Sequence, residues 1–489
     1  MSTNKLLQSM TTDDSRTLNG MLTNSTSSNA CVDLFFMIGA MRSQRNNKTR
    51  MEELTIMFDK AYRENPLVAM KILFWARDVR GGAGEREVFK TIVKHLAVNN
   101  TEALMKNLTI IPEYGRFDDL FAVFNTPAER AAIEYIMAIM LGENQMKGLC
   151  AKWLPRLGGK ISADKKLVAN KIRVAMGLTP KEYRQLVASL TNVVETAMCN
   201  KDFSSIDYQK VPSLAMSRYL KAFGKNDQER FGAYISAVKK GESKINSSAI
   251  YPYDVIKSLS GGNESAANAQ WNALPNYLDG NTESIIPMVD VSESMAWGEG
   301  KITDTLYAYD VAVSLGMYVA ERIEGTFKDH FITFTSQPTL QSMSGSLSQR
   351  LRQIKGPKGY DTNIAAAFNM LLDAAIRGRV PANDMPTKIL LISDMEFNNS
   401  CIHGTEVSAW EMISRKYEAA GYTRPGIVFW KVNSIASGNI PVKFDTTGAA
   451  LISGFSPAIL KAVLGGDILS PERVMFKTIN DPRYSKVIA

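Results

Sequence analysis

The chain of 489 residues predicts two architectures in succession, an all-α helical-repeat array over residues 31–275 and an α/β doubly wound domain over residues 284–489. Two observations lead to this prediction. Apolar residues recur three and four apart throughout the first region, which is the period of an amphipathic helix. In the second region short apolar runs alternate with helical patterns, as in a mostly parallel sheet covered by helices. The length also exceeds that of one ordinary core, so at least two domains are expected.

The composition is that of a soluble globular protein, with 45% hydrophobic and 22% charged residues. No apolar run reaches the roughly 18 residues that a membrane-spanning helix needs, and the first residues lack the pattern of a signal peptide. The four cysteines, at 31, 150, 199 and 401, show no paired spacing, and no Cys/His cluster suits zinc. A cytoplasmic, intracellular protein without membrane association is expected.

Residues 1–30 are predicted to form a flexible arm. The stretch from Thr23 to Asn29 consists of Ser, Thr and Asn alone. Such a segment buries too little apolar surface to offset the conformational entropy that ordering would cost.

Helices are predicted throughout the basic region from 31 to 275. Met51, Leu54 and Phe58 form the apolar face of one helix, and Pro66 opens the next. Further helices are expected near residues 127–142, 161–176, 179–198, 213–224 and 227–240. No run in this region has the pattern of a strand. Helices of this length suit an α-solenoid, but exact sequence repeats are not visible, which favours an irregular helical array.

Strands and helices alternate after residue 284. Strands are predicted at 285–290, 331–334, 388–394, 427–430 and 451–453. Helices are predicted at 304–323, 364–375, 407–420 and 457–463. Pro287 cannot donate to a sheet hydrogen bond, so it is expected to mark the start of the first strand.

The positive charge is concentrated before residue 281. Residues 1–280 carry 37 Lys and Arg against 28 Asp and Glu, whereas residues 281–489 carry 20 against 21. This imbalance favours a polyanionic partner for the first region, most simply nucleic acid. A solvated basic surface without a partner explains the composition equally well.

Two stretches supply candidate phosphate contacts. The first is the Gly-rich turn of residues 77–86, whose arginines could instead pair with Asp78 and Glu85. The second, residues 147–184, holds ten Lys and Arg against only Asp164 and Glu182. The predicted nucleic-acid-binding residues are Arg77, Arg80, Arg86, Lys152, Arg156, Lys160, Lys165, Lys166, Lys171, Arg173, Lys181 and Arg184. Trp153 is expected to belong to the core rather than to stack on bases.

Oxygen-bearing side chains gather at the predicted carboxyl ends of two strands. Asp290, Ser292 and Ser294 follow the first strand, Asp394 ends a later one, and Thr362 precedes a helix between them. Parallel strands end at the same edge of a sheet, so these side chains are expected to converge. Their oxygens suit Mg²⁺ or another hard divalent cation. The alternative is that the hydroxyls cap helices and the carboxylates merely end loops.

This pattern resembles the von Willebrand factor A domain, a Rossmann-like fold with a metal-ion-dependent adhesion site. The resemblance implies that the five residues just named hold Mg²⁺, directly or through water, and that an acidic group of a partner often completes the shell. Two positions depart from the family pattern: Glu293 stands where Gly is frequent, and Tyr360-Asp361 stands where Gly-Gly or Gly-Ser commonly precedes the Thr. The extra carboxylates favour a metal but repel an acidic ligand.

From about residue 50 to its end, the chain resembles the Ro autoantigen (TROVE) group and, more closely, domain-of-unknown-function family 2828. The motifs that carry the resemblance are Phe74-Trp75-Ala76-Arg77-Asp78, Arg80-Gly81-Gly82-Ala83-Gly84-Glu85-Arg86, Gly115-Arg116-Phe117-Asp118-Asp119-Leu120, Lys152-Trp153-Leu154-Pro155, Tyr183-Arg184, Val211-Pro212-Ser213 and Tyr251-Pro252-Tyr253-Asp254. The resemblance implies HEAT-like helical repeats that form a ring, an A domain that closes it, and structured noncoding or misfolded RNA on the basic surface.

The leading hypothesis is therefore a non-enzymatic, RNA-binding scaffold of ribonucleoprotein type, in which the Mg²⁺-binding domain recruits a partner or closes the ring. The alternative is an interaction adaptor that docks through its metal site onto an ATPase or a virion or assembly component. An enzyme is not expected, because the paired aspartates lack a nucleophile and His330 and His403 lack the residues that would complete a catalytic triad.

Overall fold

The computed structural model describes residues 14–17, 22–158, 160–191, 193–259, 264–335, 337–354, 363–397, 409–434, 439–465 and 469–489. The chain divides into two compact units. We call the first the sheet unit, which consists of Met1–Asn65, Tyr251–Ile256 and Asn276–Asp481. We call the second the helical unit, which consists of Pro66–Ile250, Lys257–Pro275 and Pro482–Ala489.

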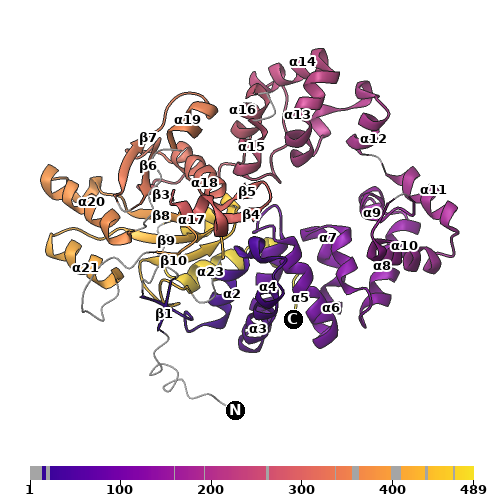
Figure 1. The fold of residues 1–489 in the computed structure, drawn as a ribbon, viewed down its shortest axis with the longest axis horizontal. Coiled ribbons are helices and arrows are strands. Elements are labelled where there is room, and N and C mark those ends of the chain that lie inside the picture. The colour runs from indigo at the N-terminus through magenta and orange to yellow at the C-terminus, as the bar shows by residue number, and fades with distance from the viewer. Residues whose placement is uncertain are drawn as a thin grey trace. The chain divides into compact units, whose positions relative to one another are not determined.

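A six-stranded sheet with the order β10-β9-β8-β3-β6-β7 forms the centre of the sheet unit (Figure 1). Its strands are β3 (Ile285–Asp290), β6 (His330–Phe334), β7 (Thr339–Ser342), β8 (Lys388–Ser393), β9 (Gly426–Lys431) and β10 (Ala449–Ser453). All neighbours are parallel except β7, which runs antiparallel to β6. The predicted, mostly parallel sheet is confirmed. The edge strand β7 escaped prediction because it is largely exposed and has no apolar run.

The central strands are buried along their whole length, which explains why their sequences read as continuous apolar runs. Pro287 lies in the middle of β3, so the prediction that it marks the start of the strand is wrong. It is tolerated there because pairing with β6 begins only at Met288, so that Pro287 lies where β3 is paired with β8 alone.

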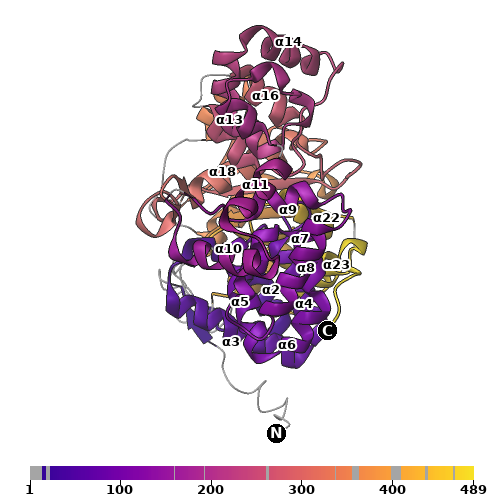
Figure 2. The same ribbon diagram turned by 90° about the vertical axis from the view of Figure 1, so that its right-hand side faces the viewer.

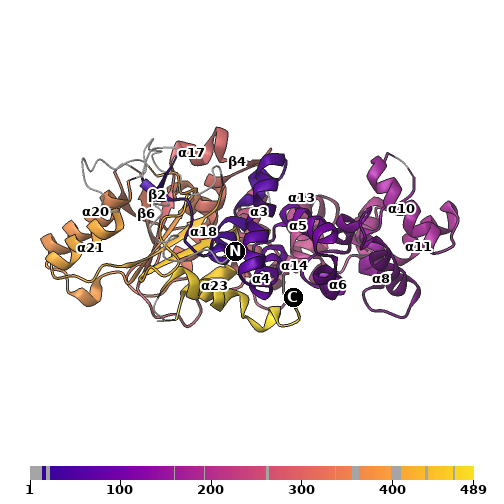
Figure 3. The same ribbon diagram turned by 90° about the horizontal axis from the view of Figure 1, so that it is seen from below.

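The sheet unit also contains helices. They are α2 (Ala30–Ile38), α3 (Lys48–Glu64), α17 (Glu293–Ala296), α18 (Ala308–Arg322), α19 (Leu347–Ile354), α20 (Ile364–Gly378), α21 (Ala409–Ala419), α22 (Leu460–Val463) and α23 (Pro471–Ile479). Helix α18 packs against β3, β6 and β8, and α2 and α23 pack against β10. Helices α20 and α21 lie side by side (Figure 3). Helices α18, α20, α21 and α22 confirm the four helices predicted after residue 284.

The N-terminal segment departs from the prediction. Helix α2 belongs to the sheet unit and not to a helical domain that begins at residue 31. The reason is its composition: eight of its nine residues are buried, so it needs apolar neighbours on every side. Part of the expected arm is also ordered, because β1 (Asp14–Arg16) pairs with β2 (Leu22–Asn24), and Thr23 Oγ1 donates to the Ile440 carbonyl (3.0 Å). Residues 1–13 lie outside the described residues.

The described part of the helical unit contains helices and no strand, as predicted. Its helices are α4 (Pro66–Arg77), α5 (Arg86–Asn99), α6 (Thr101–Asn107), α7 (Ile111–Tyr114), α8 (Glu129–Leu141), α9 (Lys147–Trp153), α10 (Ala163–Ala175), α11 (Pro180–Leu190), α12 (Val194–Cys199), α13 (Ser213–Asn226), α14 (Gln228–Lys239) and α16 (Glu264–Asn272). Helices α13, α14 and α16 pack against one another (Figure 2). Among the described residues, no helix is long and apolar enough to cross a membrane.

One predicted helix, at residues 179–198, is divided into α11 and α12. Thr179 caps α11 and forms a capping box with Glu182, as the Thr-Pro-Lys-Glu start signal predicts. The helix ends at Leu190, where the Thr191 hydroxyl donates to the Val187 carbonyl (2.6 Å). A threonine hydroxyl that bonds the backbone in this way competes with continuation of the helix.

Candidate functional site

The two predicted aspartates converge at the carboxyl edge of the sheet. Asp290 is the last residue of β3, and Asp394 follows β8 directly. The two strands are parallel neighbours, with Val289 opposite Ile392, so both strands end at the same edge of the sheet. Gly316 lets α18 approach the strand end closely, because a Cβ there would lie 2.2 Å from Val289 Cγ2. Both carboxylates are buried, with exposed fractions of 0% and 1%.

Hydrogen bonds fix the first aspartate and its neighbouring hydroxyls. Asp290 accepts from the Ser292 backbone N–H (3.0 Å) and from the Ser393 hydroxyl (2.5 Å). The Ser292 and Ser294 hydroxyl oxygens lie 3.0 Å apart. Ser292 precedes α17 but makes no side-chain capping bond, so the alternative of a simple helix cap does not describe it. The hydroxyls therefore remain beside the carboxylate, where a cation could use them.

The buried Asp394 carboxylate is only partly stabilised by its described neighbours. One of its oxygens accepts from the Glu396 backbone N–H (3.0 Å), whereas Oδ2 is buried and has no hydrogen-bond partner within the described part of the chain. Burial, and then the negative charge of Asp290, raise the pKa of Asp394 to about 7. Burial likewise raises the pKa of Asp290. A nearby cation would stabilise both ionised carboxylates.

Three further polar residues at this edge were not predicted. Glu396 is buried and accepts from Asn439 Nδ2 (2.5 Å). Lys431 ends β9 and is fully buried; its Nζ lies 3.8 Å from Met37 Sδ. Burial lowers the pKa of Lys431 to about 8, against the charges of Glu396 and Asp394, which raise it. Lys431 follows the apolar run 427–430, so the rule that found the aspartates at strand ends would have found it too.

The donor atoms at this edge fit a hard cation, because they are carboxylate and hydroxyl oxygens and one of them, Asp394 Oδ2, is buried without a partner in the described chain. Thr362, the fifth predicted ligand, lies outside the described residues. Where the structure describes the chain, no group of three or more His, Cys, Asp and Glu side chains is placed to hold a metal. A cation here would therefore depend on the serine hydroxyls and water as well as on the two aspartates.

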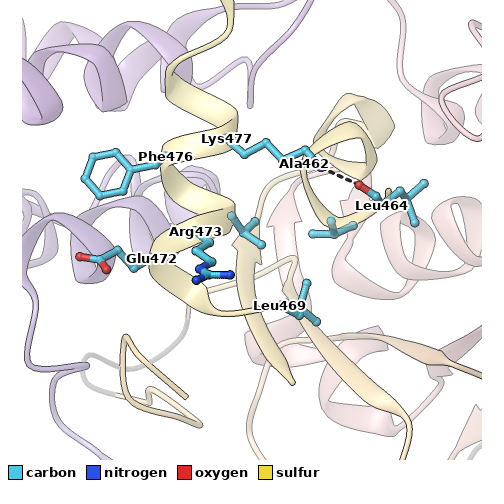
Figure 4. Close-up of a pocket in the computed structure, with 9 residues that line it drawn as sticks. Ala462, Leu464, Leu469, Glu472, Arg473, Phe476 and Lys477 are labelled. Atoms are coloured by element: carbon cyan, nitrogen blue, oxygen red, sulfur yellow. Dashed lines mark hydrogen bonds between the residues drawn. The ribbon is translucent and has the colours of Figure 1, made fainter. Parts of the chain in front are cut away.

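A cavity of about 420 Å³ between α22 and α23 is not part of this edge (Figure 4). Lys477 Nζ donates across it to the Leu464 carbonyl (2.7 Å). Leu469, which also lines it, accepts from the Gly448 backbone N–H just before β10 begins. The cavity thus lies at the amino end of β10, whereas open α/β sheets bind ligands beyond the carboxyl ends of their strands.

In the helical unit, Arg77 does not face solvent. It is 1% exposed, and its Nε donates to the equally buried Asp119 carboxylate (2.7 Å). The prediction that it contacts phosphates is wrong, because a fully buried guanidinium that is paired with a carboxylate is not accessible to a polyanion.

The rest of the Gly-rich turn also has a structural role. Buried Asp78 accepts from the Arg80 and Gly81 backbone N–H groups (3.0 and 3.1 Å). It also accepts two bonds from the Arg483 guanidinium and one from the Tyr484 hydroxyl. The alternative prediction paired the arginines of this turn with Asp78 and Glu85. For Asp78 it is wrong, because the guanidinium paired with Asp78 is that of Arg483, so Asp78 holds the C-terminal segment of the same unit.

The remaining predicted phosphate contacts fall into two groups. Arg86, Lys152, Lys171 and Arg173 are half-buried, and Lys171 is engaged by Glu129 (2.6 Å). The others are exposed: Arg80, Arg156, Lys160, Lys165, Lys166, Lys181 and Arg184. Six of these seven lie on or beside α10 and α11, with only Asp164 and Glu182 as nearby acids in the sequence. We call these six residues, all except Arg80, the α10–α11 patch.

Trp153 is half-buried rather than a core residue. The Arg116 guanidinium lies 3.7 Å from the centre of its ring, which is the geometry of a cation–π contact. The ring face on that side is therefore covered by the protein's own arginine.

Two family models match parts of this chain. Residues 17–129 and 163–282 match the family model "Domain of unknown function (DUF2828)", which confirms the resemblance to that family over the first part of the chain. Residues 284–485 match a second family model, "Domain of unknown function (DUF7788)".

The chain is also similar to individual proteins. The chain is similar to "Uncharacterized protein L728" of Acanthamoeba polyphaga mimivirus, with 27% identity over 515 residues that cover 95% of this chain and 86% of that protein. It also aligns with the crystal structure of the Deinococcus radiodurans RO (RSR) protein at 12% identity and a TM-score of 0.46, over 86% of this chain and 93% of that one.

Proposed function

We propose that this protein is a non-enzymatic scaffold that binds structured RNA through the phosphates that contact its helical unit. The observation that supports this most directly is the α10–α11 patch: six exposed cations, none with an ion pair to any described residue. Unpaired, exposed Lys and Arg side chains attract the phosphate backbone, and binding then releases condensed counterions.

The division of charge between the two units points the same way. The helical unit contains 31 Lys and Arg against 19 Asp and Glu, and the sheet unit contains 26 against 30. The formal charges are therefore +12 and −4, a sharper separation than the sequence halves suggested. The surplus belongs to the unit that carries the patch, so a polyanion would be attracted to that unit.

The test is RNA binding by the full-length protein as a function of salt. We expect Lys165→Glu with Lys166→Glu to weaken binding at least about tenfold and to reduce the salt dependence, because two phosphate contacts become repulsive. The control is Lys221→Glu with Lys225→Glu, exposed lysines of α13 whose replacement changes the net charge equally. If the wild type binds no RNA at low salt, or if both double variants behave alike, the proposal is wrong.

For the sheet unit we propose that Asp290 and Asp394, with Ser292 and Ser294, hold Mg²⁺ or another hard divalent cation that recruits a partner. Asp394 Oδ2 supports this, because it is buried and accepts no hydrogen bond from any residue that the structure describes. A bound cation would supply positive charge and open coordination positions at the edge of the sheet.

An interaction adaptor without RNA is the second candidate, and one observation favours it. Trp297 follows α17 directly, three residues beyond Ser294, and is 62% exposed. Large aromatic side chains are enriched at the centres of protein interfaces. An affinity capture in which Asp290→Asn and Trp297→Ala each abolish one protein partner, in a protein that binds no RNA, would establish the adaptor instead.

A further inference from the structure

A second cavity lies in the helical unit, on helices that the proposed RNA surface does not use. It has a volume of about 640 Å³, and its lining residues belong to the end of α14, the segment that follows it, and α16. Helices α14 and α16 are labelled in Figure 2. This volume falls within the usual range of pockets for small organic ligands. The α10–α11 patch contributes no residue to its lining.

The floor of this cavity is apolar and well supported. Val238, Ile245 and Ala269 line it, and Ile245 belongs to the hydrophobic core that α13, α14 and α16 share. Phe223 and Phe231 in that core are almost fully buried. Since packed cores resist deformation, the floor is preformed rather than shaped by a ligand.

The rim is polar and positively charged. Lys239, Lys244, Asn268 and Asn272 line it, and no carboxylate is among the lining residues in the described chain. Lys239 Nζ reaches Ser265 Oγ (2.9 Å), which bonds the end of α14 to the start of α16. The Ser243 hydroxyl oxygen in the lining is buried and has no hydrogen-bond partner within the described residues.

The two asparagines are four residues apart on α16, so they project from the same face of that helix. Each amide offers both donors and an acceptor. A ligand that satisfied this rim and floor together would carry an anionic group for the lysines, hydrogen-bonding edges for the amides and a flat apolar surface for the floor. A simple anion would use only the lysines. Phosphoserine and phosphothreonine would bring no ring for the floor, and the ring of phosphotyrosine would bring no hydrogen-bonding edge for the amides.

We propose that this cavity, which we call the α14–α16 pocket, binds a nucleoside monophosphate, either free or as one residue of an RNA chain. Lys239 and Lys244 would contact the phosphate, Ser243 would donate to it, and Asn268 and Asn272 would pair with the base or ribose. Its use as an RNA subsite rests on the function proposed above, whereas its use for a free nucleotide does not.

The test is calorimetric titration of the full-length protein with AMP, UMP, ribose 5-phosphate and inorganic phosphate. We expect saturable binding of a nucleotide that is at least tenfold tighter than that of inorganic phosphate. Lys239→Ala with Lys244→Ala should weaken it at least tenfold, and Asn272→Leu should weaken the nucleotide but not inorganic phosphate. Lys240→Ala, an exposed neighbour that does not line the pocket, is the matched control and should change nothing.

The proposal is overturned if no nucleotide saturates, if phosphate binds as tightly as the nucleotide, or if Lys240→Ala acts like the double variant. Competition then separates the two sources of ligand: an RNA oligonucleotide that displaces AMP shows an RNA subsite, and one that binds without displacing it shows a site for free nucleotides. Nucleotide binding that survives Lys165→Glu with Lys166→Glu distinguishes this pocket from the α10–α11 patch. A protein that binds nucleotide but no RNA refutes the proposed function and leaves this inference intact.

Discussion

Several charged side chains in this protein are buried. Some of them form complete ion pairs, and others do not. Arg77 is neutralised by Asp119, and Asp78 by Arg483, each within the helical unit. Asp290 and Asp394 lie together without a comparable ion pair among the described residues, and Lys431 is the buried cation whose charge acts on Asp394. Buried ion pairs that are complete are structural, whereas a carboxylate pair short of positive charge is typical of a functional site.

The raised pKa of Asp394 predicts how stability depends on pH in the metal-free protein. The folded-state pKa, about 7, exceeds the usual value of 3.8, so the folded state binds the proton more tightly. The contribution of Asp394 to stability should be greatest below about pH 4 and should be lost as the pH rises through 7, by a few kcal/mol at most. Thermal unfolding in a chelator at about pH 5 and about pH 8 measures the change.

Two controls make this prediction specific. Asp394→Asn cannot ionise and should remove most of the difference between the two pH values. Saturating Mg²⁺ should restore stability to the wild type at the higher pH, because the cation binds only the deprotonated carboxylate. An equal pH dependence in Asp394→Asn would contradict the assignment of the effect to this residue.

The buried pair in the helical unit predicts a large loss of stability on mutation. Arg77→Ala leaves buried Asp119 with only the longer contact to Lys90 (4.0 Å), so the free energy of unfolding should fall by about 3–5 kcal/mol. Arg80→Ala, at an exposed position of the same turn, should change it by less than about 0.5 kcal/mol. Urea unfolding followed by circular dichroism measures both, and equal effects would show that the Arg77 pair is not structural.

At the scale of elements, the Gly-rich turn between α4 and α5 is determined by a close approach of backbone. A Cβ at Gly82 would lie 1.8 Å from the Trp75 carbonyl oxygen, which itself accepts from the Ala83 N–H (3.1 Å). Gly84 also has a positive φ of 71°. The glycines are therefore required by the turn itself, and no phosphate needs to be invoked to explain them.

Gly82→Ala should consequently destabilise the protein by several kcal/mol, since the turn must open to admit the methyl group. Gly232→Ala is the matched control: this glycine lies within α14, its added Cβ meets nothing within 4 Å, and alanine is the better helix former. It should stabilise by about 0.5–1 kcal/mol. Equal destabilisation by both substitutions, measured by thermal unfolding, would rule out the steric explanation.

At the scale of the whole molecule, neither unit is a continuous stretch of chain. Helix α2 packs on β10, about 400 residues later, and the Phe35 carbonyl accepts from the Ser453 hydroxyl (3.1 Å). Pro482–Ala489 in turn belong to the helical unit, where the Tyr114 hydroxyl donates to the Arg483 carbonyl (2.6 Å). The sheet unit thus includes the N-terminal segment of the chain, and the helical unit includes the C-terminal segment.

This arrangement predicts that α2 and the sheet unfold together. Phe35→Asp places a charge at a position with 0% exposure and should cost more than about 4 kcal/mol, with faster hydrogen exchange in β9 and β10 and unchanged exchange in α13 and α14. Ile56→Asp on α3, which is 57% exposed, should leave exchange unaltered. Unchanged protection of β10 in Phe35→Asp would show that α2 is not part of the same cooperative unit.

The sequence by itself determined the local elements and the strand ends that carry Asp290 and Asp394. Period and continuity of apolar residues are local properties, so β3 was predicted with its observed limits and β8 to within one residue. Exposure and long-range partnership are not local. Only the tertiary structure decided that Arg77 is paired with Asp119 and that α2 covers β10, because residues far apart in the chain supply each of these neighbours.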